Sequence, residues 1–171
     1  MKKLRQILFP CVLLSLTPFA MAQNFEVPKN YELKKAEDYA KYEKEIIDCV
    51  NWLENTPIDE ERAKREEANV FLMVWMTGSP NVSIEINASI LGSIDKNKEL
   101  LLIFMGGWTK YAIENPIDQK DLIKCNMAGL KSVIKVYKMG NGVKKDKNIE
   151  KLAKLDESGG LEKWVKDQLK V

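Results

Sequence analysis

The stretch LLLIFMGGWTKYAIEN, residues 100–115, decides what kind of helix lies at the centre of this chain. Six apolar residues run into Gly106 and Gly107, and the aromatic residues Trp108 and Tyr111 follow closely. Each glycine inside a helix costs about 1 kcal/mol relative to alanine, so a compensating contact is expected. Either the glycines admit the backbone of a neighbouring helix, or they open a kink that exposes the aromatic rings to a ligand. We favour helix packing and keep the ligand site as the alternative.

A helix advances about 100° per residue, which divides this stretch into two faces. One face is predicted to carry the core residues, which are Leu101, Phe104, Trp108, Tyr111 and Ala112. The opposite side is predicted to carry Gly106, Gly107, Lys110 and Glu114. The best candidate for a binding surface is this region together with the nearby turn in WMTGSPN, residues 75–81, and it comprises Gly78, Ser79, Gly107, Trp108 and Lys110.

Apolar residues recur at helical spacing along most of the chain, which predicts helices over 31–54, 57–78, 95–114, 118–139, 147–155 and 161–169. Thr56 and Pro57 suit the N-cap and the first position of the second helix. Gly78 and Gly140 suit helix ends. Residues 82–86 fit either a short extended segment or an irregular helix. The pattern predicts an all-α domain of five to seven helices, arranged as a bundle or as stacked helical hairpins.

Residues 1–22 have the pattern of a secretory signal peptide. Three basic residues precede a short apolar run, and Ala20-Met21-Ala22 offers a cleavage site before Gln23. The apolar run is shorter than the roughly 20 residues that span a bilayer, so a retained membrane anchor is the less favoured alternative. We expect a secreted or periplasmic protein of 149 of the 171 residues, folded as a single domain over 23–171.

The mature chain has almost no net charge. Cleavage removes Lys2, Lys3 and Arg5 from the 27 basic residues, so 24 basic residues face 25 acidic ones and the formal charge is −1. A nucleic-acid partner is therefore not expected, because no global basic field remains.

Two cysteines, Cys49 and Cys125, remain after cleavage. An oxidising compartment permits one disulfide between them. Both lie on apolar faces of predicted helices, so two buried free thiols are an equally good expectation.

Several chemistries are disfavoured by composition. The chain has no histidine, which removes Ser-His-Asp and Cys-His catalysis and histidine metal sites, and no cofactor is expected. Paired carboxylates remain an option, because Glu54, Asp59, Glu60 and Glu85 all lie near predicted helix ends. Lys131, Lys135 and Lys138 form a stripe at helical spacing, which predicts either a solvated face or a site for an acidic partner.

These observations favour a non-enzymatic protein that binds another protein or a component of the cell envelope. The alternative is a binder or carboxylate-based hydrolase of envelope sugar or peptide, with Trp75 or Trp108 stacking on the substrate. A structural subunit of a self-assembly is a third reading. An exposed apolar groove would favour the first, and a pocket that combines tryptophan with carboxylates would favour the second.

Overall fold

The computed structural model describes residues 25–171, so the expected signal peptide and its cleavage site lie outside the described residues. The described part contains eight helices, α1 (Ala36–Lys41), α2 (Glu43–Asn55), α3 (Arg62–Gly78), α4 (Ala88–Leu91), α5 (Glu99–Glu114), α6 (Leu122–Met139), α7 (Lys147–Glu157) and α8 (Leu161–Leu169). It contains no strand, which confirms the all-α class. The expected number of five to seven helices is slightly low, because α1 and α4 are short additional helices.

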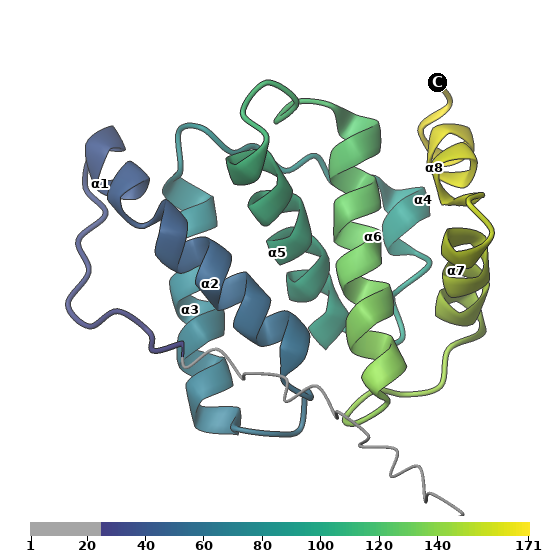
Figure 1. Cartoon of the computed structure of the whole chain (residues 1–171), viewed down its shortest axis with the longest axis horizontal. Helices are drawn as coiled ribbons and strands as arrows, with labels where there is room; N and C mark the ends of the chain where they lie inside the picture. Colours follow the sequence, from purple (N-terminus) through teal and green to yellow (C-terminus); the bar gives the residue numbers. More distant parts are fainter. Residues whose placement is uncertain (1–24) are drawn as a thin grey trace, which may run out of the picture.

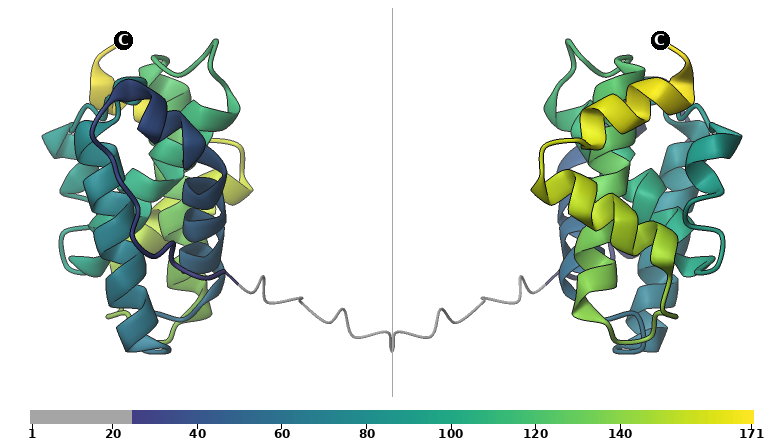
Figure 2. Two further views of the ribbon diagram at one scale, coloured as in Figure 1. Left: turned by 90° about the vertical axis from the view of Figure 1, so that its left-hand side faces the viewer. Right: turned by 90° about the vertical axis from the view of Figure 1, so that its right-hand side faces the viewer.

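Helix α5 lies at the centre of the fold. It packs most extensively against α6 and also contacts α2 and α3. Figure 1 shows α2 beside α5, with α6 on its other side, and Figure 2 shows α7 and α8 crossing the outer side of α6. Trp75, Trp108, Phe71 and Phe104 are the largest side chains in the core, and each is at most 1% exposed.

The two glycines of α5 are buried, as expected for a packed helix. A Cβ atom on Gly107 would lie 2.7 Å from Cβ of Ser132 and 2.9 Å from the carbonyl oxygen of Ala128, both on α6. Gly129 of α6 makes the reciprocal approach, since its Cβ would lie 2.8 Å from the backbone oxygen of Phe104. Gly107 and Gly129 therefore let the backbones of α5 and α6 approach each other closely.

The predicted faces of α5 were partly wrong. Leu101 is 38% exposed and Tyr111 is only half-buried, whereas Gly106 and Gly107 belong to the interior. The reason is that α5 has neighbours on several sides, so its buried arc is wider than the single stripe that the apolar residues define.

The predicted helix over 31–54 is divided into α1 and α2 at Tyr42 and begins later. The carboxylate of Asp38 accepts hydrogen bonds from the backbone N–H groups of Lys34 and Lys35, both at 3.2 Å, and thereby caps the start of α1. The ring of Tyr42 packs edge-on against Phe71 at 6.1 Å.

Two further helix starts were placed too early. Thr56 ends α2 instead of capping α3, and the guanidinium of Arg65 donates to the carbonyl oxygens of Thr56 and Pro57 at 2.5 and 3.1 Å. These bonds fix the first two residues of the loop that precedes α3. The start of α5 at Glu99 follows a turn in which the buried Asn97 exchanges two hydrogen bonds with the backbone of Lys144.

Other boundaries agree with the prediction. Helix α3 ends at Gly78, and α6 ends before Gly140, which has the left-handed φ of 81°. Residues 82–87 form no regular element, and no helix within residues 25–171 is long and apolar enough to span a bilayer.

The two cysteines are free thiols in this structure, so the disulfide is not formed. Cys49 donates to the carbonyl oxygen of Ala68 at 3.5 Å, and Cys125 donates to that of Gln119 at 3.5 Å. Burial raises the pKa of Cys49 to about 12 and the pKa of Cys125 to about 11. Both therefore remain protonated at neutral pH and behave as small apolar residues.

The close approach of α5 and α6 makes a matched pair of substitutions informative. Gly107→Ala should lower the free energy of unfolding by about 1–2 kcal/mol, because overpacking against the α6 backbone exceeds the gain in helix propensity. Gly106→Ala should cost less than Gly107→Ala, because the atoms nearest to its Cβ would be side-chain methyl groups of Leu72 and Val50 at 3.3 Å, which need to shift by only a few tenths of an ångström. Urea unfolding followed by tryptophan fluorescence measures both, and equal effects would contradict the proposed helix approach.

Candidate functional site

The C-terminal end of α2 carries a charged residue into the interior. Glu54 is 3% exposed, and its carboxylate faces both α5 and α6. Lys110 of α5 donates to Oε2 at 2.8 Å, and the hydroxyl of Ser132 on α6 donates to Oε1 at 2.6 Å. Burying a carboxylate is unfavourable unless it is paired and hydrogen-bonded, and these two contacts meet that condition.

A second ammonium group reaches the same carboxylate. Lys135 of α6 has its Nζ atom 3.6 Å from Oε2 of Glu54, the oxygen to which Lys110 already donates. The ammonium of Lys110 also donates to Oδ1 of Asn51 at 3.1 Å. Because Lys110 and Lys135 share one carboxylate, this cluster has one positive charge more than it has negative charges.

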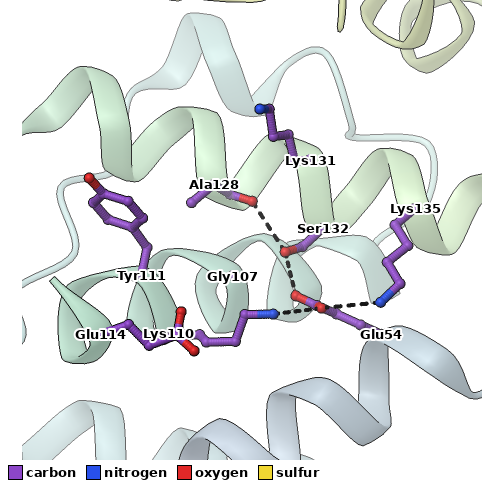
Figure 3. A pocket seen from close by; sticks show the side chains of 9 residues that line it. All are labelled: Glu54, Gly107, Lys110, Tyr111, Glu114, Ala128, Lys131, Ser132 and Lys135. Atoms are coloured by element: carbon purple, nitrogen blue, oxygen red, sulfur yellow. Dashed lines mark hydrogen bonds and ion pairs between the residues drawn. The ribbon is translucent and has the colours of Figure 1, made fainter. Parts of the chain in front are cut away.

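The cluster borders a pocket of about 230 Å³, which we call the lysine pocket. Its lining residues are Glu54, Gly107, Lys110, Tyr111, Glu114, Ala128, Lys131, Ser132 and Lys135 (Figure 3). The small residues Gly107, Ala128 and Ser132 lie where α5 and α6 approach each other closely, and longer side chains surround them. The space of the pocket therefore results from the same small residues that bring the two helices together.

The walls of the lysine pocket carry unequal numbers of charges. Lys110, Lys131 and Lys135 face two carboxylates, those of Glu54 and Glu114, so the formal charge of the lining is +1. The ammonium of Lys131 lies at the edge, 3.9 Å from a carboxylate oxygen of Asp156 on α7. Burial raises the pKa of Tyr111, so its phenol is neutral at physiological pH.

Part of the predicted binding surface belongs to this pocket. Gly107 and Lys110 line it, whereas Trp108 is 1% exposed and is part of the core. Gly78 and Ser79 lie at the end of α3, where Gly78 is covered by the ring of Tyr39, and they do not line the pocket.

The predicted lysine stripe is divided between two environments. Lys131 and Lys135 line the pocket, and Lys138 instead donates to Glu157 of α7 at 2.7 Å. Tyr111 was expected to contact a ligand only in the alternative reading with a kinked helix, and it lines the pocket without such a kink being needed. Glu114, Ala128 and Ser132 were not predicted as lining residues. The only sequence signal for Ala128 and Ser132 was that two small residues lie four positions apart on a mostly apolar helix.

The carboxylates considered for catalysis do not converge. Glu54 lines the lysine pocket, and Asp59 lines a separate pocket of about 350 Å³ beside Arg62 and Arg65. Glu60 and Glu85 are exposed and line neither pocket. Within residues 25–171 no group of three acidic or cysteine side chains is placed to hold a metal ion.

Stacking of a substrate on tryptophan also lacks a site. Trp75 is fully buried and donates from Nε1 to the carbonyl oxygen of Tyr39 at 3.0 Å. Trp108 is buried beside Phe104, with ring centroids 6.2 Å apart. Neither indole is accessible to a ligand in this structure.

An exposed apolar groove of about 500 Å³ lies elsewhere on the surface. Ile86, Leu91, Ile94 and Leu101 contribute its apolar side chains, and Ile86 is 59% exposed. Leu101 and Lys110 are nine residues apart on α5, which is two and a half turns. The groove and Lys110 therefore lie on opposite faces of this helix.

Comparison with known proteins gives no relative from which to infer function: no protein-family model matches the chain, and neither do curated proteins or solved structures.

The network around Glu54 yields a stability prediction. Glu54→Gln should lower the free energy of unfolding by about 2–3 kcal/mol, because two ammonium groups lose their partner in a partly buried site. Glu157→Gln is the matched control, since it removes an exposed pair with Lys138 and should change stability little. Urea unfolding at pH 7 measures both, and a Glu54→Gln protein as stable as the control would show that the network contributes nothing.

Proposed function

We propose that this chain is a non-enzymatic binding protein of the periplasm or the extracellular space, and that the lysine pocket binds an anionic group of its ligand. The observation that carries the proposal is the sharing of one carboxylate oxygen by Lys110 and Lys135. An ammonium group has three donors, and the single contact of Lys135 at 3.6 Å leaves donors for a ligand. The side chain of Lys135 is 47% exposed, so a ligand can reach it.

The geometry favours binding over catalysis at this site. The Glu54 carboxylate is almost inaccessible, and each of its oxygens already accepts a hydrogen bond. The hydroxyl of Ser132 is 2.6 Å from Glu54 and 3.2 Å from the carbonyl oxygen of Ala128, so it too is engaged within the protein. These groups hold the lysines in place, which is the arrangement that a preorganised anion site requires.

The secreted or periplasmic location rests on the sequence of residues 1–22, whose basic, apolar and small-residue segments follow in the order of a signal peptide. In that compartment an anionic group can belong to a soluble metabolite or to an envelope lipid or polymer. All of these present the same chemistry, a phosphate or carboxylate, to the lysine pocket.

Substitution of Lys135 tests the anion site. Isothermal titration calorimetry at low ionic strength should detect inorganic phosphate or acetate binding to the mature protein, and Lys135→Gln should weaken it about threefold to tenfold, or roughly 1 kcal/mol. Lys138→Gln is the control, because Lys138 is on the same helix but pairs with Glu157 outside the pocket. Added salt should weaken binding by the wild type.

The source of the anion is distinguished in the same experiment by phosphatidylglycerol vesicles. Binding to vesicles without binding to phosphate or acetate would assign the pocket to a lipid headgroup. Absence of binding to all three probes, or equal loss in Lys135→Gln and Lys138→Gln, would overturn the proposed anion site.

The apolar groove favours a second candidate function, the binding of a protein partner through an apolar segment. Single exposed apolar residues are common, but a contiguous exposed apolar surface is typical of interaction sites. Because the groove and Lys110 lie on opposite faces of α5, this function does not compete with the lysine pocket.

A charge placed in the groove tests that second function. Leu101→Lys should abolish the retention of a partner from envelope extract, because it places an ammonium group in an apolar contact. Ile117→Lys is the matched control, since Ile117 is 97% exposed and lies outside the groove. Equal retention by the wild type and both variants would exclude the groove as the docking site.

A further inference from the structure

The far end of the lysine pocket carries a carboxylate that the fold does not use. Glu114 is the last residue of α5 and is exposed, and no ion pair or hydrogen bond to its side chain is found within residues 25–171. Lys110 lies four residues earlier, at a spacing that often gives an ion pair within a helix. Its ammonium instead reaches Glu54 (Figure 3) and also donates to Asn51.

The position of Glu114 makes a bound cation favourable. The C-terminal end of a helix carries the negative end of the helix dipole, so a carboxylate there is destabilised and a cation is stabilised. No basic residue occupies the last turn of α5 to compensate. The aromatic ring of Tyr111 lines the same end of the pocket and can contribute a cation–π contact.

Lys135 and Glu114 lie at opposite ends of the lysine pocket, separated along the axes of α5 and α6. Gly107 faces Ser132 in the middle, and α6 runs antiparallel to α5 after a short loop (Figure 1). Glu114 lies seven residues beyond Gly107 in one direction, and Lys135 lies three residues beyond Ser132 in the other. At about 1.5 Å per residue, their backbone positions are roughly 15 Å apart along the axes, and both side chains line the same pocket between them.

We propose that the ligand of the lysine pocket is zwitterionic, with an anionic group against Lys135 and a primary ammonium group against Glu114 and Tyr111. This inference rests on the proposed anion-binding function and adds the second, cationic determinant. Free amino acids with a long side chain and short peptides with a terminal amine belong to this chemical class.

Three small probes separate the two determinants. 6-Aminohexanoate has a carboxylate and an ammonium at opposite ends of a flexible chain, hexanoate lacks the ammonium, and glycine has both charges close together. Isothermal titration calorimetry with the mature wild-type protein should give 6-aminohexanoate an affinity about threefold to tenfold above that of hexanoate and above that of glycine, since an ammonium paired with an exposed carboxylate and an aromatic ring contributes roughly 1 kcal/mol.

Variants then assign each charge to its residue. Glu114→Gln should remove the advantage of 6-aminohexanoate over hexanoate and leave the affinity for hexanoate unchanged. Lys135→Gln should weaken the binding of both probes. Glu157→Gln is the control for a lost surface carboxylate, since Glu157 pairs with Lys138 away from the pocket, and it should change neither affinity.

The outcomes distinguish this inference from the function on which it rests. If hexanoate and 6-aminohexanoate bind equally and Lys135→Gln weakens both, the anion site stands and the zwitterionic ligand is overturned. A preference for 6-aminohexanoate that persists in Glu114→Gln also overturns it, because the ammonium is then bound elsewhere. If neither probe binds, the anion site for carboxylates fails together with the inference.

Discussion

The fold depends on the close approach of α5 and α6, which is made by glycine on one helix facing small residues on the other. Gly107 admits Ser132 and the backbone at Ala128, and Gly129 admits Phe104. Two mid-helix glycines in α5 cost about 2 kcal/mol of helix propensity, which the packing of α5 against its neighbours must exceed. Because α5 contacts α2, α3 and α6, the position of this one pair determines where the surrounding helices can lie.

The same approach creates the candidate site. Because Gly107, Ala128 and Ser132 are small, α5 and α6 approach each other closely at these residues. The lysine pocket lies beside them and is surrounded by longer side chains. The hydroxyl of Ser132 occupies the space left by the absent Cβ of Gly107 and donates to Glu54. Glu54 in turn connects α2 to α5 and α6 by one carboxylate. A buried ion pair is seldom more stable than an apolar contact of similar size, so the role we assign to Glu54 is to position Lys110 and Lys135.

Helical periodicity was sufficient to predict the all-α class and most helices, because each amphipathic helix has a 3.6-residue repeat. The boundaries that failed depend on particular side chains. Asp38 caps α1, and Arg65 holds the carbonyl groups of the loop before α3, although its partner Thr56 has the residue type of an N-cap. A capping residue that sequence reasoning assigns to the next helix can therefore end the previous one when a distant side chain binds its backbone.

The candidate site was predictable only as separate pieces. The lysine stripe and the glycine pair were visible in the sequence, and the structure brings Lys131, Lys135, Gly107 and Lys110 to one pocket. Glu54 and Ser132 are 78 residues apart, and no local pattern encodes their contact. Trp108 was predicted on the core face of its helix and was a candidate ligand contact only if a kink exposed it. Because α5 is one continuous helix, Trp108 stays in the core, about 100° around the helix from Gly107.

Lys135 and Glu114 carry two charges of the lysine pocket that are not needed to neutralise Glu54, because Lys110 already pairs with it. Lys110 and Ser132 each donate to one oxygen of Glu54, and the half-exposed Lys135 adds a second cation to this carboxylate. Glu114 adds a carboxylate at a helix end that disfavours negative charge. A site for a ligand with two opposite charges needs both, one at each end of the same pocket.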